Sequence, residues 1–255
     1  MVDTLPCLDL LEKTQGYSRF VFNLPTESEM GSLDFMSSDE ISCVTQKAVD
    51  AFKVAYDHPV DSTSIFYYIY GLFHSPDYRE RYANNLMREF PRIPRVATYE
   101  QFMSFVEAGQ TLADLHVNFE NVKPYAGVNL EFTKVGTPSY RVSKMKWGTI
   151  KNKKGNAAKD KTTLIYNDWI TVKNIPLEAQ EYVVNKKSAL DWIVKFACVS
   201  IDESSGIVND FNEFAATQGN ERYPLDLFLR VITVSLETMK IVKSLPKLEI
   251  HPLDS

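Results

Sequence analysis

The sequence has little cysteine, no long apolar run and none of the motifs that mark common enzyme classes. Its 255 residues include three cysteines, Cys7, Cys43 and Cys198, whose odd number and wide spacing fit neither a disulfide framework nor a zinc site. No apolar stretch approaches the ~20 residues that cross a bilayer, and the N-terminus lacks the basic start of a secretory signal. We therefore expect a cytoplasmic protein that contacts no membrane.

Catalytic and cofactor-binding motifs are missing as well. There is no GxxxxGK[ST] phosphate loop, no GxGxxG fingerprint, no GxSxG elbow and no Asn-Pro-Pro-aromatic tetrapeptide of amino-methyltransferases. The four histidines show no HExxH pattern. His74 and His116 fall on the apolar sides of expected helices, where a hydrogen-bonded core histidine is commoner than a ligand. The acidic pairs at 202–203 and 210–213 fit loop and cap positions. We expect no intrinsic active site, no metal and no cofactor in this chain.

What the sequence does have is a strong segregation of charge. The formal net charge is −5, yet the segment 134–161 holds nine of the 28 basic residues and only one of the 33 acidic residues, Asp160. Such a basic segment on an acidic protein is typical of a face that binds polyanions. The alternative is a solvated lysine-rich loop without a partner, because most charge runs are simply solvated.

Hydrophobic periodicity predicts helices in the first half of the chain. Capping boxes at Ser37 with Glu40 and at Thr98 with Gln101 start two of them, and Ser75 followed by a proline starts another. The expected helices span 37–56, 62–74, 76–90 and 98 to at least 116. In the last of these, a core-facing stripe repeats at i, i+3, i+4 and i+7; it consists of Phe102, Phe105, Val106, Gly109, Leu112, Ala113 and His116.

Beyond residue 124 the pattern becomes one of strands and then of helices again. Alternating apolar and polar residues predict antiparallel strands within 129–135, 139–147 and 162–172. The polar stretch 151–161, KNKKGNAAKDK, is expected to be an exposed loop. Further helices are expected at 176–184, 188–197 and 224–242.

This order of elements predicts an α+β fold, a helical body that carries a small antiparallel β-sheet with a basic exposed loop. An irregular segment, 1–36, precedes one domain, 37–255. The domain is expected to be helical over 37–120, β-rich over 125–173 and helical over 174–245.

The basic loop is the first candidate for binding nucleic acid. Asn152, Asn156 and Arg141 could reach base edges in a major groove. Trp147 and Tyr166 flank the loop, although such aromatics pack on a sheet more often than they stack on a base. Seven lysines are expected to contact phosphates: Lys144, Lys146, Lys151, Lys153, Lys154, Lys159 and Lys161.

A second candidate region is the group of arginines between 79 and 95. Arg79 and Arg81 are expected to pair with acids of their own helix. Arg92 and Arg95 lie in the proline-bounded turn FPRIPR, outside the helical spacing that would pair them with those acids. They are candidates for a phosphate contact or for tying the turn to the body.

The block FYYIYGLFHSPDYRERYANNLMREFPRIP (66–94) resembles the start of the C-terminal specificity domain of type ISP restriction–modification enzymes. Later blocks agree in the same order, so the resemblance extends from about Ile65 to the end, while residues before about Ser37 match only loosely. These blocks are 105–120, 140–147, 174–185, 205–215 and 222–242.

The resemblance implies a function. Family members join a nuclease, an ATP-driven helicase-like translocase, an adenine methyltransferase and a target-recognition domain in one polypeptide. This chain would then recognise a sequence in double-stranded DNA and direct adenine methylation and ATP-driven translocation and cleavage by the other modules of the enzyme, with the methyltransferase and helicase modules as its partners. ATP, Mg²⁺ and S-adenosylmethionine would belong to those modules.

The alternative is a protein-docking scaffold of the same complex without autonomous DNA binding. It predicts an exposed apolar patch on the helix at 62–74, formed by Phe66, Tyr67, Tyr70 or Phe73.

Overall fold

The computed structural model describes residues 18–22, 40–151 and 156–252. They form two compact units. Unit 1 runs to Val117 and includes the C-terminal segment from Ser244, and unit 2 comprises Asn118–Lys243. The β-rich region and most of the second helical region therefore share one unit. Among the described residues, no helix is long and apolar enough to cross a membrane.

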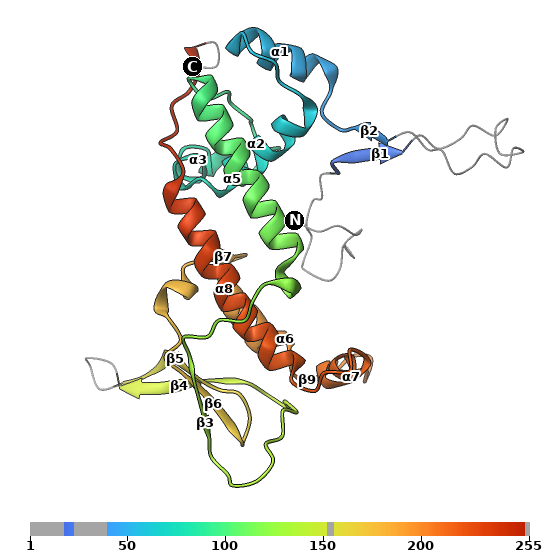
Figure 1. Ribbon diagram of the computed structural model, residues 1–255, viewed down its shortest axis with the longest axis vertical. Coiled ribbons are helices and arrows are strands. Elements are labelled where there is room, and N and C mark those ends of the chain that lie inside the picture. Colours follow the sequence, from blue (N-terminus) through green and yellow to red (C-terminus); the bar gives the residue numbers. More distant parts are fainter. Residues whose placement is uncertain (1–17, 23–39, 152–155, 253–255) are drawn as a thin grey trace, which may run out of the picture. The chain divides into compact units, whose positions relative to one another are not determined.

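Unit 1 is mainly helical (Figure 1). Its longest helices among the described residues, α2 and α5, cross closely, and β1 pairs with β2 in antiparallel register. The elements of unit 1 are β1 (Phe20–Phe22), β2 (Glu40–Ser42), α1 (Gln46–Tyr56), α2 (Ser62–His74), α3 (Pro76–Arg81), α4 (Ala83–Leu86) and α5 (Tyr99–Val117).

Two of the predicted helix starts in unit 1 are confirmed. The Ser75 hydroxyl accepts a hydrogen bond from the Tyr78 amide at 3.4 Å, and the Thr98 hydroxyl accepts one from the Gln101 amide at 3.3 Å. Each satisfies an amide at a helix N-terminus that has no partner within the helix. Every member of the predicted stripe on α5 is buried except the last, His116, which is partly buried.

The predicted capping box at residue 37 is wrong. Glu40 lies in β2 opposite Phe22, and α1 begins only at Gln46, where Thr45 supplies the cap. Ser37 lies outside the described residues. Strand pairing with a segment some 18 residues earlier overrides the local capping pattern. The expected helix 76–90 is likewise divided at Tyr82, whose ψ of 16° departs from helical values.

The crossing of α2 and α5 depends on two glycines. A Cβ atom on Gly71 would lie 2.3 Å from the Phe105 carbonyl oxygen, and one on Gly109 would lie 1.9 Å from the Tyr67 carbonyl oxygen. Both distances are far below van der Waals contact, so only glycine allows these backbones to approach so closely.

Three tyrosine hydroxyls attach the PRIP string (91–94) and the residues just after it to the helices of unit 1. Tyr78, Tyr68 and Tyr56 donate to the carbonyls of residues 92, 94 and 96 at 2.8, 2.6 and 2.9 Å, respectively. Burial raises the pKa of Tyr78 to about 12. The conspicuous PRIP string thus has a structural role, because its carbonyls satisfy buried phenols.

Unit 2 is built around an antiparallel sheet with strand order β3-β6-β5-β4 and the long helix α8 (Figure 1). The sheet and α8 share a core in which Leu164, Ile170, Val172, Phe228 and Ile232 are each fully buried. The strands are β3 (Asn129–Phe132), β4 (Lys146–Lys151), β5 (Ala157–Ile165), β6 (Ile170–Lys173), β7 (Val183–Val184), β8 (Lys187–Ser188), β9 (Val199–Ile201) and β10 (Val208–Asp210). The helices are α6 (Ala189–Phe196), α7 (Phe211–Thr217) and α8 (Tyr223–Ser244), with short 3-10 turns at Phe119–Asn121 and Leu177–Gln180.

Several local predictions for unit 2 need correction. Of the expected strand 139–147, only the last two residues belong to β4. The expected loop 151–161 is largely strand, because β5 already begins at Ala157. The expected helix 176–184 is a single 3-10 turn followed by β7, since the residues after it adopt a tight hairpin turn instead of continuing a helix. The helices expected at 188–197 and 224–242 are confirmed.

Candidate nucleic-acid interface

The centre of the basic segment is the β4–β5 hairpin, which contains a large bulge. Trp147 pairs with Leu164, but the next residue, Gly148, pairs with Asp160. Residues 161–163 of β5 therefore have no partner in β4 and protrude from the ladder. A Cβ atom on Gly148 would lie only 3.0 Å from the Cβ of Thr163, so a glycine suits the crowded position beside the bulge.

The bulge directs Lys161 to an anchor on α6. The Lys161 ammonium group forms an ion pair with Asp191 and lies 4.4 Å from the ring centroid of Trp147. The same Asp191 oxygen accepts a hydrogen bond from Trp147 Nε1 at 2.8 Å. Partial burial raises the pKa of Asp191, but the hydrogen bonds from Lys161 and Trp147 outweigh this effect and lower it. Asp191 thus fixes the base of the hairpin.

A hollow of about 380 Å³ lies beside this anchor. Its lining includes one lysine from each strand of the hairpin, Lys146 and Lys159. Apolar residues from β4 and α6, Trp147 and Val194, also line it. The lining residues are Met145, Lys146, Trp147, Gly148, Thr149, Ala157, Ala158, Lys159 and Val194.

Four of the seven predicted phosphate-binding lysines are exposed and unpaired. Within the described part of the chain, none of them forms an ion pair with a carboxylate, in contrast to Lys161. Lys159 lies opposite Thr149 in the ladder. Lys151 follows Thr149 by two residues in β4, so Lys151 and Lys159 lie on the same face of the hairpin. The four are Lys144, Lys146, Lys151 and Lys159.

The remaining loop residues are only partly described. Asn152, Lys153 and Lys154 lie outside the described residues, and Asn156 is exposed directly before β5. Trp147 and Tyr166 are 8% and 0% exposed, so the structure favours their role in the core over base stacking. The Tyr166 hydroxyl donates to the Tyr140 carbonyl at 2.6 Å.

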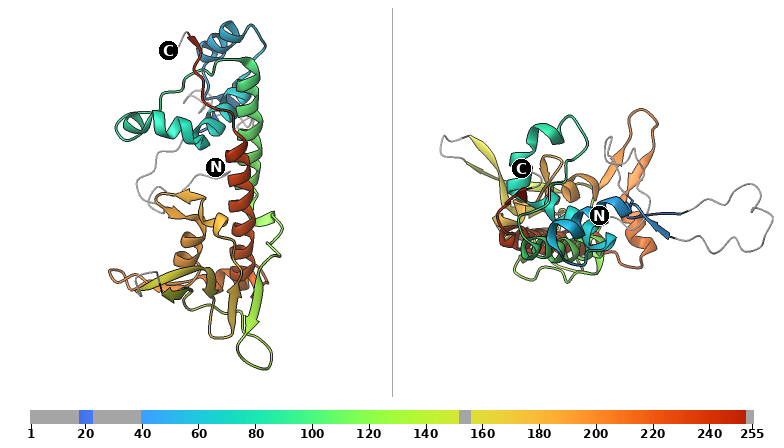
Figure 2. Two further views of the ribbon diagram at one scale, coloured as in Figure 1. Left: turned by 90° about the vertical axis from the view of Figure 1, so that its left-hand side faces the viewer. Right: turned by 90° about the horizontal axis from the view of Figure 1, so that it is seen from above.

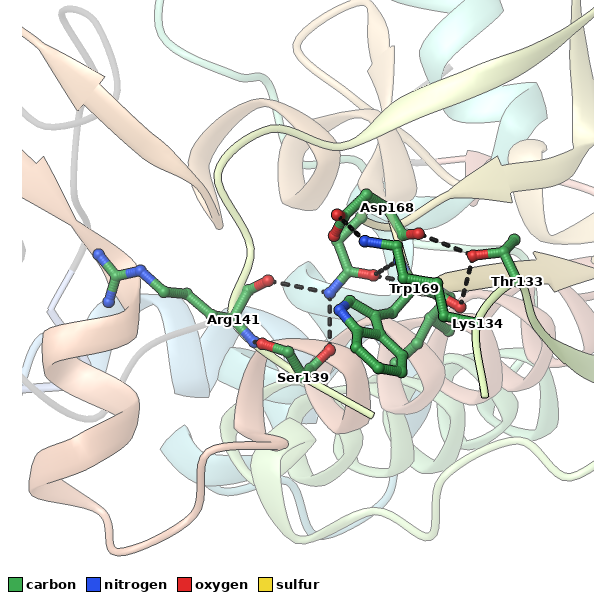
Figure 3. A network of polar contacts seen from close by, with 8 residues as sticks. Thr133, Lys134, Ser139, Arg141, Asp168 and Trp169 are labelled. Atoms are coloured by element: carbon green, nitrogen blue, oxygen red, sulfur yellow. Dashed lines mark hydrogen bonds and ion pairs between the residues drawn. The ribbon is translucent and has the colours of Figure 1, made fainter. Parts of the chain in front are cut away.

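Arg141, which the sequence analysis expects to contact a base edge, is already engaged within the protein. Its guanidinium forms an ion pair with Asp210, which also caps α7 by accepting from the Asn212 amide. In Figure 3 this guanidinium points away from the neighbouring Lys134 and Asp168, which pair with each other. Base contact by Arg141 would require it to leave Asp210.

The same close-up shows what holds the loop before β4 (Figure 3). The Asn167 amide donates to the carbonyls of Ser139 and Arg141 at 2.8 and 2.9 Å. On the other side, the Thr133 hydroxyl donates to the Asp168 carbonyl at 2.7 Å. Residues 133–141 are thereby fastened to the β5–β6 turn, without the regular strand that periodicity predicts.

Several arginines of unit 1 are also engaged, although the expected pairing of Arg79 with the acids of its helix is not found among the described residues: its Nε donates to the Phe73 carbonyl at 2.6 Å. Arg92 pairs with Glu89 at 3.1 Å, so the expectation that it lies beyond the reach of the acids of its helix is wrong. The chain turns after α4 and brings the two side chains together at i, i+3. Arg95 donates to the Ala51 carbonyl at 3.1 Å, which confirms that it ties the turn to the body.

The remaining polar clusters belong to the framework. His74 Nδ1 is 2.8 Å from the Tyr70 carbonyl oxygen, and His116 Nδ1 is 2.7 Å from the Tyr70 hydroxyl, so both are hydrogen-bonded core histidines as predicted. No group of three or more His, Cys, Asp or Glu in the described part of the chain could hold a metal ion.

Sequence reasoning missed the two α6 residues that complete the hairpin site. Asp191 stands three residues after the helix cap Ser188, where an acid is ordinarily assigned to capping. The sequence pattern indicates only an ordinary core residue at Val194. Their role depends on the contact between α6 and the bulge, which no local pattern reveals.

Comparison with known proteins places these features in a family. The model of the type ISP C-terminal specificity domain matches residues 1–227. The chain belongs to this family. The match includes the first 36 residues, for which the resemblance seen in the sequence is only loose. A comparison with the curated proteins gave no significant match.

Three solved structures that contain DNA or a DNA mimic, two of them of type ISP enzymes, resemble this specificity domain. An ATP-dependent type ISP restriction–modification enzyme, LlaBIII bound to DNA, is 34% identical over 91% of this chain and 14% of that one, with a TM-score of 0.73. A DrdV–DNA complex is 31% identical over 98% of this chain and 23% of that one, with a TM-score of 0.76.

A nuclease-deletion mutant of the type ISP enzyme LlaGI, in complex with a DNA substrate mimic, is 43% identical over 75% of this chain and 17% of that one, with a TM-score of 0.64. The chain therefore spans less than a quarter of the length of each of these three structures.

Proposed function

We propose that this specificity domain binds double-stranded DNA through the β4–β5 hairpin of unit 2 and recognises the target sequence of a type ISP restriction–modification enzyme. The observation that carries the proposal is the set of unpaired lysines around the hollow of the hairpin. Three of the related solved structures contain DNA or a DNA mimic, which supports the same reading. Methylation, translocation and cleavage would be performed by the other modules of the parent enzyme.

The geometry suits a phosphodiester backbone. Lys146 and Lys159 come from the two strands and line one hollow, so their ammonium groups can contact phosphates along one path. A two-stranded ribbon is narrow enough to enter a major groove. Because the described part of the hairpin offers lysines rather than bidentate side chains, it would supply affinity. Base readout would require polar side chains nearby, such as Asn156.

The proposal is tested with the 255-residue chain by fluorescence anisotropy against random duplexes over a range of salt concentrations. If the four unpaired lysines contact phosphates, the slope of log affinity against log salt should be about −4. The double variant K146A/K159A should lower its magnitude by about 2. The matched control K47A/K53A removes the same charge from the exposed face of α1 and should leave the slope nearly unchanged.

Selection and sequencing of the bound duplexes then test recognition. Enrichment of one asymmetric site would support target recognition, and retention of that preference by K146A/K159A would show that these lysines supply affinity rather than specificity. Absence of binding even at low salt would refute the proposal for the isolated chain.

The docking-scaffold alternative finds less support on α2. Phe66, Tyr67, Tyr70 and Phe73 are all partly buried rather than exposed, so the apolar patch that this alternative predicts is absent from that helix. The match to a specificity-domain family supports a non-catalytic role for this chain in the parent enzyme.

A further inference from the structure

A second cationic feature of unit 2 lies on the β7–β8 hairpin. Val184 pairs with Lys187 across a two-residue loop, and the loop residues Asn185 and Lys186 both have positive φ, 48° and 67°. This is the geometry of a tight hairpin turn whose twist matches that of the strands. It presents Lys186 and Lys187 to solvent.

Behind this turn, α6 contributes an aromatic pair. The rings of Trp192 and Phe196 are stacked, with centroids 5.4 Å apart and an interplanar angle of 2°. Trp192 Nε1 donates to the Val184 carbonyl at 2.8 Å, which fastens the indole to the hairpin. Phe196 is 51% exposed, so its ring is accessible to solvent.

Two lysine ammonium groups are held against these rings. Lys187 Nζ lies 4.7 Å from the Trp192 centroid, and Lys195 Nζ lies 5.5 Å from Trp192 and 4.7 Å from Phe196. Neither lysine pairs with a carboxylate among the residues that the structure describes. A ring positions an ammonium group without neutralising its charge, so both charges remain available. We call Lys187, Trp192, Lys195 and Phe196 the aromatic shelf.

We propose that the aromatic shelf is a second phosphate-binding site for the DNA backbone, separate from the β4–β5 hairpin. The inference rests on the proposed function. Prepositioned ammonium groups lose less side-chain entropy on binding an anion than freely rotating lysines do. The shelf thus offers two fixed cations, where most surface lysines offer mobile ones.

The position of α6 favours DNA over other anionic partners. One side of this helix supplies Asp191 to the hairpin anchor and Val194 to the hollow, while Trp192 and Phe196 form the shelf. In both views of Figure 2, the β4–β5 hairpin (yellow) and the segment of α6 and β7 (gold) lie on the same side of α8. Helical spacing places the shelf residues on a different side of α6 from Asp191 and Val194, so only an extended polyanion such as a DNA duplex can contact both sites.

The test is the double variant K187A/K195A of the 255-residue chain, titrated with random duplexes over a range of salt. Both side chains are exposed, so the variant is expected to fold. We expect the magnitude of the salt slope to fall by about 2 with no change in the selected sequence. K47A/K53A is again the control for the loss of two charges.

A second variant tests the rings. W192L keeps an apolar side chain but removes the surface that holds the ammonium groups, and it should weaken binding about threefold at fixed salt with a smaller change in slope. If K146A/K159A lowers the magnitude of the salt slope but K187A/K195A leaves it unchanged, the shelf is not a phosphate-binding site and the proposed function still stands. This is also the outcome expected if the shelf binds a protein instead of DNA. Equal losses in K187A/K195A and K47A/K53A would also overturn it, and absence of binding by the unmodified chain would overturn both proposals.

Discussion

In unit 1, buried tyrosine hydroxyls bond to the carbonyls of residues 92–96, and the arginines of the same turn are engaged by Glu89 and the Ala51 carbonyl. In unit 2, Lys146, Lys159 and Lys187 on two hairpins have no carboxylate partner among the described residues, whereas Lys161 pairs with Asp191. Polar groups that satisfy one another stabilise a fold, whereas unpaired charges on projecting hairpins are available to a ligand. This difference is the basis of our proposal that the hairpins of unit 2 bind DNA.

The largest expected effect tests the helix crossing of unit 1. In G109A the new Cβ would meet the Tyr67 carbonyl oxygen at 1.9 Å, and neither backbone can yield without separating α2 from α5. We expect the free energy of unfolding to fall by about 3 kcal/mol, measured by urea denaturation. The control G219A adds a Cβ with no atom within 4 Å and should cost about 1 kcal/mol, from its positive φ alone. Equal costs for the two variants would show that the crossing is not tightly constrained.

The next effect tests the ion pair that anchors the β4–β5 hairpin of unit 2 to α6. D191A removes the partner of both the Lys161 ammonium and Trp147 Nε1, and it should lower the free energy of unfolding by about 2 kcal/mol. D191N keeps an acceptor for the indole and should cost less. Measurement of both by tryptophan fluorescence in urea separates the loss of charge from the loss of the hydrogen bond. No cost in D191A would mean that the hairpin is not anchored there.

A smaller effect concerns acid stability of unit 1. Burial lowers the pKa of His74 to about 4, and burial with the nearby charge of His74 lowers that of His116 to about 3. The unfolded chain binds protons near pH 6.5, so stability is fully present above pH 6.5 and is lost as the pH falls towards 4.

The double variant H74Q/H116Q should therefore flatten the dependence of unfolding free energy on pH between 6.5 and 4. H58Q, at an exposed histidine, serves as the control. If H58Q flattens the profile as much as H74Q/H116Q does, the buried pair is not responsible.

The smallest expected effect is that of R92A, a variant that tests whether unit 1 contributes to DNA binding. In R92A we expect a loss of less than about 0.5 kcal/mol in unfolding free energy, because the pair with Glu89 is solvent-exposed. The salt slope for DNA should stay the same. A slope reduced by about 1 would show that Arg92 leaves Glu89 for a phosphate, and the contrast between the two units would no longer hold.

Much of the fold follows from the sequence where local signals and burial agree. The stripe on α5, the caps at Ser75 and Thr98, and the start of α6 at Ser188 combine a helical period with a capping side chain. Prediction failed where a distant strand intervened, as at Glu40 in β2, and where the turn at Asn185 and Lys186 ended a helix-like pattern. In these places long-range pairing outweighs local preference.

The candidate site divides in the same way. The sequence by itself determined the concentration of basic residues near the hairpin and the family blocks, because both are properties of composition and order. Only the tertiary structure decided which cations are available. It pairs Arg141 with Asp210 and Lys161 with Asp191, leaves Lys146 and Lys159 beside the hollow, and sets Lys187 and Lys195 on an aromatic pair. A charge is neutralised by what lies within a few ångströms of it, and those neighbours come from segments that lie far apart in the chain.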